Sequence, residues 1–197
     1  MMDATIRYPV EWIDRFQLAD GRWVTLRPVL PQDDAQEREF VAYGMTSRSR
    51  YLRFQSGLGA LPESLVHAFT HVDYHNHFAL VAESFPGGRQ VQVGDARFVR
   101  DGSDPRSAEF GIAVADAWGG LGIGKRLLCQ LVVAARSKGV EVMYGDVLRD
   151  NRAMLSMARS VGFAVRRHPE EIRLVRVERP LAERMEAVTV AGCGCEC

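Results

Sequence analysis

The segment of the sequence best suited to bind a ligand is a glycine-rich loop followed by two cations. The loop contains Gly119, Gly120, Gly122 and Gly124. Lys125 and Arg126 follow it, and apolar residues then recur with helical spacing up to Gly139. Because the dipole of a helix disfavours cations in its first turn, we expect a negatively charged group there. The backbone N–H groups of the loop, the helix end and the two cationic side chains therefore predict a site for a pyrophosphate.

Two common phosphate-binding loops match this segment incompletely. Residues 119–125 have the spacing of a P-loop, but Arg126 stands where that loop needs Ser or Thr to bind magnesium. The dinucleotide fingerprint G-x-G-x-x-G requires a third glycine where this chain has Leu127. The remaining alternative to a pyrophosphate site is a flexible glycine turn whose charges are solvated.

Predicted strands and helices surround this loop. The β-branched and alternating patterns predict strands at 23–29, 77–84, 90–100, 108–114, 140–148, 163–168 and 171–177. Apolar spacing and end signals predict helices from residue 33, over 47–55, over 61–69, from 123 to 139 and from 151 to 162. Turn-rich links join three consecutive strands into an antiparallel meander. The chain therefore predicts an α/β fold with a mixed, mainly antiparallel sheet flanked by helices.

The composition indicates an ordinary globular domain. The 197 residues are 47% hydrophobic, and 25 acidic residues balance 25 Lys and Arg. No long block of one charge predicts a nucleic-acid partner, and no apolar run approaches the length of a membrane span. The N-terminus lacks the apolar segment of a signal peptide, and three of the four cysteines fall in the last five residues, unlike a disulfide framework. We therefore expect a cytoplasmic protein with neither nucleic-acid nor membrane partners.

Four segments of the chain resemble the acyl-CoA core of the GNAT N-acetyltransferases: AEFGIAV, AWGGLGIGKRLL, YGDVL and NRAMLSMARSVGF. The resemblance covers residues 23–177. The loop pattern of the family is Q/R-x-x-G-x-G/A, which Gly122 and Gly124 match. Gly119 stands at the Gln/Arg position, so one side-chain contact to the pyrophosphate is missing. Most contacts from such a loop are backbone N–H donors, which remain.

Two further segments are similar to the GNAT domain of bacterial protein lysine acetyltransferases. They are SRYLRF, residues 49–54, and the pair Asp73 and Tyr74. The resemblance implies the GNAT acyl-CoA N-acyltransferase fold, with a sheet splayed between 108–114 and 140–148 so that acetyl-CoA enters the gap. We divide the chain accordingly into an N-terminal extension (1–21), an acetyltransferase domain (22–178) and a flexible, cysteine-rich tail (179–197).

The resemblance also implies which residues hold acetyl-CoA, the expected cosubstrate. Backbone groups of Ile112, Ala113 and Val114 would pair with the pantetheine arm, and Asn151 would lie near the amide groups of that arm. The loop residues implied are Gly119, Gly120, Leu121, Gly122, Ile123, Gly124 and Lys125. Asn151 has a second explanation, because Asn before a helix commonly caps it.

Acetyl transfer to an amine needs a base, because the ammonium group of lysine has a pKa of about 10.4. Glu109, which opens the strand before the loop, is the predicted general base, and Asp146 on the next strand is a second catalytic candidate that supports the base or the amine. A solvated carboxylate at a strand end is the alternative for both. Many family members have a tyrosine acid seven residues after Asn151, where this chain has Ala158. A thiol with a pKa of about 8.5 can leave without that acid.

Histidines and cysteines raise the question of a metal site. His67, His71, Asp73, His75 and His77 lie close together in the sequence, and the tail CGCEC offers three thiols. Spacing is their only support, and a closed zinc site usually has four ligands. We expect no metal, and assign residues 67–77 to a wall of the acceptor site.

These observations predict an acetyl-CoA-dependent N-acetyltransferase that works by direct transfer without an acyl-enzyme. A protein lysine is the favoured acceptor, and a polyamine or similar small amine is second. Residues 46–55 and 67–77 are the regions expected to decide between them. A non-catalytic acyl-CoA-binding module is the alternative from another class, suggested by Gly119 and Ala158.

Overall fold

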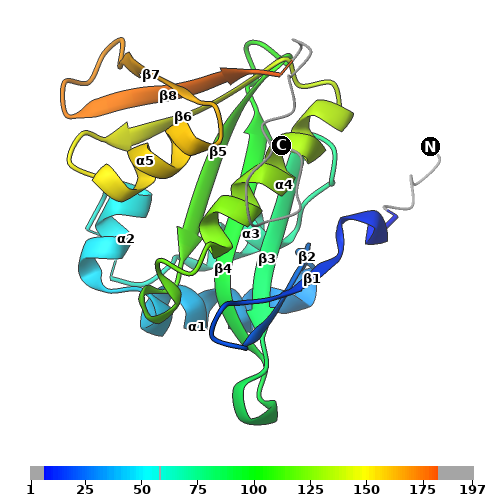
Figure 1. The fold of residues 1–197 in the computed structure, drawn as a ribbon. Helices are drawn as coiled ribbons and strands as arrows, with labels where there is room; N and C mark the ends of the chain where they lie inside the picture. The colour runs from blue at the N-terminus through cyan, green and yellow to red at the C-terminus, as the bar shows by residue number, and fades with distance from the viewer. Residues whose placement is uncertain (1–6, 58, 182–197) are drawn as a thin grey trace.

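The computed structural model describes residues 7–57 and 59–181, which form a sheet of eight strands covered by helices (Figure 1). The strands are β1 (Asp14–Gln17), β2 (Trp23–Pro28), β3 (His77–Ser84), β4 (Val91–Arg100), β5 (Ser107–Val114), β6 (Val142–Leu148), β7 (Ala164–Arg167) and β8 (Leu174–Pro180). Their order in the sheet is β1-β2-β3-β4-β5-β6-β8-β7. All neighbours are antiparallel except β5 and β6. This confirms the expected α/β fold with a mixed, mainly antiparallel sheet.

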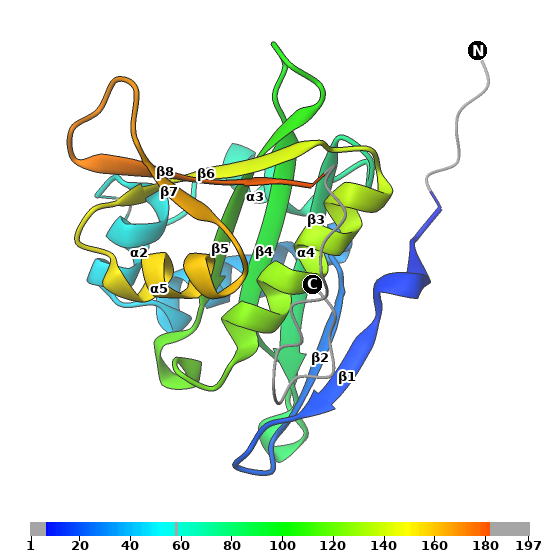
Figure 2. The ribbon, with the colours of Figure 1, turned by 45° about the horizontal axis from the view of Figure 1, so that its top comes forward.

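β5 and β6 lie together for a short distance and then separate. Their paired residues are Ser107 with Val142, Ala108 with Met143 and Glu109 with Tyr144. On its other edge, β5 pairs with β4 from Ala108 to Val114. In Figure 2, β6 and β8 cross the view at a steep angle to β4 and β5. The predicted splay is therefore present, and it leaves one edge of β5 without a strand partner beyond Glu109.

Helices cover both faces of the sheet. In Figure 1, α4 (Ile123–Ser137) and α5 (Arg152–Ser160) lie in front of the strands. α1 (Asp34–Glu39), α2 (Ser47–Phe54) and α3 (Glu63–Thr70) lie behind them. α4 has the apolar stripe that the sequence predicts, and its buried side chains include Leu127, Leu128, Leu131 and Val132. These leucines pack in one core with Phe78, Leu80 and Phe98 of the sheet, so the stripe fixes the start of α4 beside the end of β5.

The segment before Trp23 is part of the sheet, which differs from the extension expected at 1–21. β1 pairs with β2 from Asp14 opposite Leu26 to Gln17 opposite Trp23. Ala19, Asp20 and Gly21 make the turn between them, and Gly21 has a φ of +87°. An Asp-Gly pair is a strong hairpin signal because its glycine adopts positive φ without strain. The hairpin places Asp14 within reach of α4.

The C-terminal boundary also differs from the one expected. β8 continues to Pro180, past the expected boundary at residue 178, and Leu181 is buried. β8 inserts between β6 and β7, so its residues face β6 over the full length of that strand. The cysteines of CGCEC lie outside the described residues. Within 7–57 and 59–181, no helix is both long and apolar enough to cross a membrane.

Candidate active site

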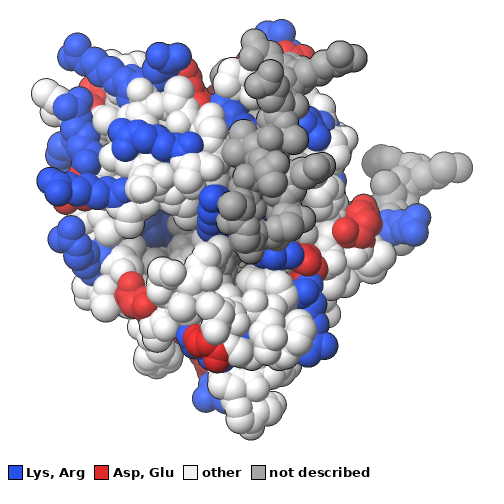
Figure 3. Space-filling model, viewed as in Figure 1, with Lys and Arg blue, Asp and Glu red and all other residues white. Residues whose placement is uncertain are grey.

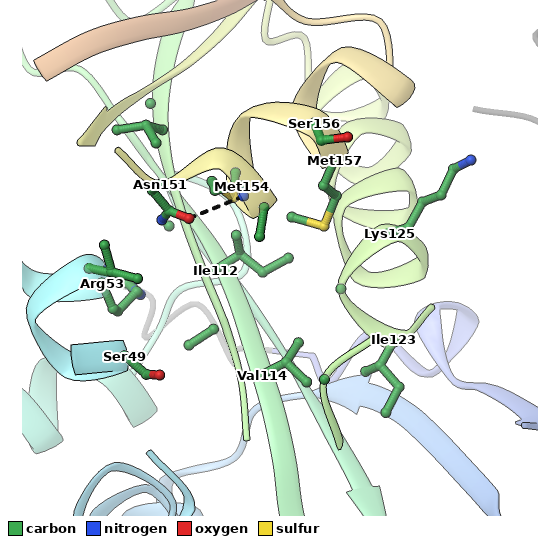
Figure 4. A pocket seen from close by; sticks show the side chains of 18 of the residues that line it. Ser49, Arg53, Ile112, Val114, Ile123, Lys125, Asn151, Met154, Ser156 and Met157 are labelled. Carbon is green, nitrogen blue, oxygen red and sulfur yellow. Dashed lines mark hydrogen bonds between the residues drawn. The ribbon is translucent and has the colours of Figure 1, made fainter. Parts of the chain in front are cut away.

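A cavity of about 630 Å³ opens where β5 and β6 separate (Figure 4). It is bounded by α2, β5, the glycine loop, the start of α4, β6 and α5. Its lining includes Met45, Ser49, Leu52, Arg53, Gln55, residues 109–114, Trp118, Gly119, Gly120, residues 122–125, residues 145–147, Asn151, Met154 and Met157. The cavity thus brings together nearly all of the residues that the sequence assigned to acetyl-CoA, although they come from separate segments.

The glycine loop ends at a helix that has no side-chain cap. Gly122 is the N-cap of α4 with a φ of +86°, a conformation that glycine adopts without strain. The first intrahelical hydrogen bond runs from Arg126 N–H to Gly122 O. The N–H groups of the preceding turn therefore have no partner inside the helix and carry its partial positive charge. This end of the cavity is suited to a phosphate.

The two cations after the loop differ in their surroundings. Lys125 lines the cavity, but in Figure 4 its side chain extends to the outer side of α4, away from Ile112 and Asn151. Arg126 bonds to the Asp14 carboxylate, with Nε 2.6 Å from Oδ2, and lies over the Phe16 ring. The expectation that Arg126 helps to bind the anion is therefore wrong, because the β1–β2 hairpin holds it on the other side of the helix. The backbone N–H groups at the start of α4 therefore remain the main candidates for binding the anion.

Leu121 is the one loop residue of the predicted set that does not line the cavity. It packs against the hydrophobic core instead. An apolar side chain gains more by leaving water than by facing a solvated loop end. Its contribution to cofactor binding stays a prediction and would come from the backbone.

The backbone of β5 alternates between β4 and the gap. Ala115 N–H donates to Val93 O at 2.9 Å, continuing the ladder with β4. Hydrogen bonding to one neighbour alternates along an antiparallel strand, so Ala113 also faces β4, whereas Ile112 and Val114 face the gap. Of the three residues predicted to pair with pantetheine, Ile112 and Val114 are therefore placed for it. Ala113 is not, because its backbone groups are directed to β4.

Two glycines set the width of the cavity. A Cβ at Gly124 would lie 3.0 Å from Met157 Sδ, and one at Gly145 would lie 2.9 Å from Cε1 of the Phe110 ring. The first glycine lets α4 approach α5, and the second lets an aromatic ring of β5 reach across to β6. A side chain at either position would force these neighbours to move, which would change the shape of the cavity.

Asn151 performs its structural role and also lines the cavity. Its side-chain oxygen accepts a hydrogen bond from Met154 N–H at 3.2 Å, which caps α5. The two explanations given by the sequence are thus compatible. Ala158 is fully buried in α5 and does not line the cavity, so this position supplies no acid.

Hydrogen bonds to both ends of the cavity hold α2 in place. Asp116, beside the loop, accepts from Thr46 N–H at 2.6 Å and from Ser49 Oγ at 2.5 Å. At the other end, Gln55 Nε2 donates to Asp146 O at 2.7 Å. Residues 46–55, one of the two regions expected to decide the acceptor, therefore do form a wall of the cavity.

Residues 67–77 do not form such a wall, and that prediction is wrong. None of them lines the cavity. The Asp73 carboxylate instead accepts backbone N–H groups of His75, Asn76 and His77, which shapes the turn before β3. Burial and the charge of Arg97 lower the pKa of His77 to about 4. Across 7–57 and 59–181, no group of three or more His, Cys, Asp or Glu is arranged to hold a metal.

Glu109 lies at the far end of the cavity from the loop. Its side chain lines the cavity and remains exposed there. Partial loss of hydration and the charge of Asp146 raise the pKa of Glu109, against the opposing charges of Arg176 and Arg53. A carboxylate with a raised pKa is a better base than an ordinary glutamate. The position and the direction of the shift both suit the predicted role.

Asp146 lines the same end but is bound to two side chains. Arg176 Nε lies 2.9 Å from Oδ1, Arg176 Nη2 lies 2.9 Å from Oδ2, and His168 Nε2 lies 3.2 Å from Oδ2. Burial opposes ionisation, but the hydrogen bonds and charge of Arg176, with His168, hold the pKa of Asp146 below its ordinary value. Such a carboxylate is a poor proton acceptor. Its structure favours support of Glu109 over a role as base.

Three functional candidates at this end were missed in the sequence. Arg176 and His168 reach Asp146 from β8 and the loop after β7, and Arg53 reaches the cavity from α2. Arg176 stands directly opposite Asp146 in the ladder between β6 and β8. The sequence does show an Arg in the last predicted strand. It cannot be assigned to Asp146, however, until the register between the two strands is known.

The surface around the cavity is unevenly charged although the chain has no net charge. Lys and Arg gather on the left of the face shown in Figure 3, where Figure 1 places α5, β7 and β8. The arginines on these elements that are not buried are Arg152, Arg159, Arg166, Arg167 and Arg176. A positive surface of this kind attracts anionic ligands toward the site.

Comparison with known proteins agrees with this geometry. The model of the family described as "Acetyltransferase (GNAT) family" matches residues 50–163. The chain is 34% identical over 164 residues to "Acetyltransferase Pat" of Mycolicibacterium smegmatis, covering 83% of this chain and 48% of that protein. It is 29% identical over 160 residues to "Acetyltransferase PA5475" of Pseudomonas aeruginosa, covering 81% of this chain and 84% of that protein. The chain thus spans about half the length of the first relative.

A solved structure shows the same arrangement of elements. The crystal structure of the GNAT domain of S. lividans PAT superimposes with a TM-score of 0.80 at 27% identity. The match covers 88% of this chain and 99% of that domain. The expected acetyltransferase fold is therefore confirmed.

Proposed function

The chain belongs to the GNAT acetyltransferase family, and on that premise we propose that it moves the acetyl group of acetyl-CoA to the side-chain amine of a protein lysine. The observation that carries the proposal is the unpaired edge of β5, which runs along the cavity from the start of α4 to Glu109. A long donor with a pyrophosphate near one end and a thioester at the other fits that layout.

Acetyl-CoA is held mainly by backbone groups of the protein. The N–H groups at the uncapped start of α4 bind the pyrophosphate, and those of Ile112 and Val114 pair with the amides of the pantetheine arm. Asn151 lies beside the same arm. When bound, acetyl-CoA supplies a thioester carbonyl that an amine can attack. The residues present fit acetyl-CoA. The N–H groups at the start of α4 would meet the pyrophosphate, and those along the edge of β5 would meet the pantetheine arm, in the order in which the two parts are joined.

Glu109 acts as the general base. Its carboxylate removes a proton from the lysine ammonium, directly or through a water, and the raised pKa makes it a stronger acceptor for that proton. Asp146 contributes through Glu109, because its negative charge is one of the causes of the raised pKa. It is a positioning residue in this scheme, held by Arg176 and His168.

The neutral amine then attacks the thioester carbon. The C–N bond forms as the C–S bond breaks, and backbone N–H groups of β5 that face the gap stabilise the negative charge on the carbonyl oxygen. As the amide forms, its nitrogen releases the second proton to water, and the thiolate takes a proton from water, since Ala158 offers none. No covalent bond to the protein is needed.

A protein lysine is the proposed acceptor because the chain is most similar, among the relatives described above, to GNAT domains named Pat, and because α2 carries the segment SRYLRF. A small polyamine is the second candidate, favoured by the two carboxylates Glu109 and Asp146 at the cavity end. The positively charged amines of a free polyamine would be small enough to approach both carboxylates.

Release of free thiol from acetyl-CoA tests the proposal. The purified chain is incubated with acetyl-CoA and either a lysine-rich protein or spermidine, and thiol is measured with and without each acceptor. We expect release that depends on the protein acceptor. Release with spermidine alone would move the acceptor to the small-amine class. Binding of acetyl-CoA without release from any acceptor would favour the non-catalytic module.

A further inference from the structure

The Arg53 guanidinium lies against the backbone of β5, inside the cavity. An ideal Cβ placed at Gly111 would be 2.5 Å from Arg53 Nη2 and 2.7 Å from both Cζ and Nη1. Gly111 therefore leaves the space that the guanidinium occupies. In Figure 4, Arg53 extends from α2 toward β5. The side chain is thus built into the site rather than directed to solvent.

Among the described residues, the Arg53 guanidinium makes no hydrogen bond, and its contacts include the faces of the Phe54 and Phe69 rings. Its Nε is buried and unpaired, as is Nε of Arg50 and of Arg100, but those two arginines donate to backbone carbonyls through their other nitrogens. By contrast, Arg97 Nη2 lies 2.8 Å from Asp95 Oδ2, and Arg176 Nη2 lies 2.9 Å from Asp146 Oδ2. A buried guanidinium donor without an acceptor is costly, so its retention points to a ligand that supplies one.

The position of Arg53 identifies which part of a substrate it would meet. Gly111 and Glu109 are two residues apart on β5, so their side-chain positions share the face of the sheet on which α2 lies. The loop that would bind the pyrophosphate is at the opposite end of β5. Arg53 is therefore beside the acyl group and the amine, not beside the phosphates.

We propose that Arg53 binds a carboxylate carried by one of the two reacting substrates, so that the site favours a substrate with such a group. This inference rests on the proposed transferase function. The planar fork of a guanidinium matches a carboxylate with two parallel hydrogen bonds. The carboxylate has two sources: the far end of a dicarboxylic acyl group, as in succinyl-CoA, or the α-carboxylate of a free amino-acid acceptor, in which case the acceptor belongs to the small-amine class and not to protein lysines. In either case the C–S bond breaks, the C–N bond forms and the amine proton passes to Glu109.

Binding separates this inference from the proposed function. Two stable thioethers of CoA are titrated into the protein: S-(3-carboxypropyl)-CoA, whose carboxylate lies at the same chain length as that of succinyl-CoA, and its uncharged isostere S-(4-oxopentyl)-CoA. We expect the carboxylate form to bind about 10-fold more tightly if the acyl group is the source. If neither analogue nor acetyl-CoA binds, the transferase assignment itself fails and takes the inference with it.

Turnover distinguishes the two sources. In one arm, succinyl-CoA is compared with its isostere 4-oxopentanoyl-CoA at a fixed acceptor. In the other, free lysine is compared with lysinamide at fixed acetyl-CoA. We expect a preference of about 10-fold in kcat/KM for the carboxylate in one arm. Equal values in both arms, with normal transfer from acetyl-CoA, would overturn the inference and leave the proposed function intact.

Three variants assign the preference to Arg53. Arg53→Gln removes the charge, and Gly111→Ala keeps the charge but displaces the guanidinium. Both are expected to abolish the preference. Arg48→Gln is the matched control, because it removes an arginine from the same helix at a side chain that is 74% exposed. In the contrary outcome, Arg53→Gln and Gly111→Ala would lower kcat/KM for all substrates by the same factor and leave the preference for a carboxylate unchanged. That result would show that Arg53 only supports the fold.

Discussion

The two ends of the cavity are built from different groups. Near α4, the donors are backbone N–H groups of one continuous segment, 119–125. Near Glu109, the groups are side chains from several elements, including Arg53 of α2, Asp146 of β6 and Arg176 of β8. Backbone groups suit the pyrophosphate, which every CoA ester carries. We expect the side chains to decide which acyl group and which amine react, and how fast.

This difference predicts a division of effects. Changes in the glycine loop should weaken binding of every CoA ester alike. Changes at the far end should leave that affinity nearly unaltered and change turnover or substrate preference. A variant that violates the division would show that the two ends are coupled.

Glu109→Gln should have the largest effect. We expect kcat to fall about 100-fold or more, because a positioned base typically contributes at least that much. The dissociation constant for acetyl-CoA should remain within about twofold of the original, because the amide keeps the shape of the side chain. Thiol release and calorimetry on the same preparation measure both. Glu141→Gln, at an exposed residue just before β6, is the control. Equal turnover in the two variants would remove Glu109 from the chemistry.

Gly122→Ala should have the next largest effect, and on affinity. Gly122 has a φ of +86°, where a side chain costs about 1 kcal/mol or more, so the loop is expected to shift. We expect the dissociation constant for acetyl-CoA to rise about 10-fold. Gly139→Ala is the matched control, because Gly139 has a φ of +78° at the other end of α4. It should lose similar stability in thermal unfolding but bind normally. Equal loss of binding in both would mean that instability alone explains the effect.

Arg176→Gln should move the pH dependence of turnover. The charge of Arg176 lowers the pKa of both Asp146 and Glu109, so its removal raises both. Because the base must be ionised, the acid limb of the kcat profile should shift to higher pH, and kcat should fall more at acidic than at basic pH. Arg166→Gln, on exposed β7, should leave the limb in place. A shift of the limb to lower pH would contradict the described electrostatics.

Lys125→Gln should have the smallest effect. Its side chain extends away from the centre of the cavity, so a loss of less than about fivefold in acetyl-CoA affinity is expected. Titration of acetyl-CoA at low and moderate salt measures it. A loss as large as that of Gly122→Ala would show that this side chain, and not the backbone, carries the phosphate contact.

The same difference decides what could be predicted from the sequence. The loop end of the cavity is formed by one continuous segment of the chain. Its glycine spacing and the start of the α4 apolar stripe are both visible within that segment, so both were predicted. Arg126 was misassigned because its partner, Asp14, lies 112 residues away in an unpredicted hairpin. The Asp20–Gly21 pair was the available signal.

The far end depends on register and packing. Glu109 and Asp146 were proposed from their places near strand ends, but their different environments come from Arg176, which only the β6–β8 ladder brings opposite Asp146. Residues 67–77 were assigned to the acceptor wall because histidines near a helix suggest function. The Asp73 carboxylate instead shapes the turn before β3, and the rings of His67 and His71 stack on each other. No pattern of neighbouring residues in the sequence shows which of these side chains lie at the cavity and which lie elsewhere.

The measurement that tests the account most directly is isothermal titration of the chain with acetyl-CoA. The account predicts saturable binding at one site, weakened in Gly122→Ala and retained in Glu109→Gln. Absence of binding by the unaltered chain would contradict it, because the splayed β5 edge and the uncapped start of α4 would then have no acyl-CoA to hold.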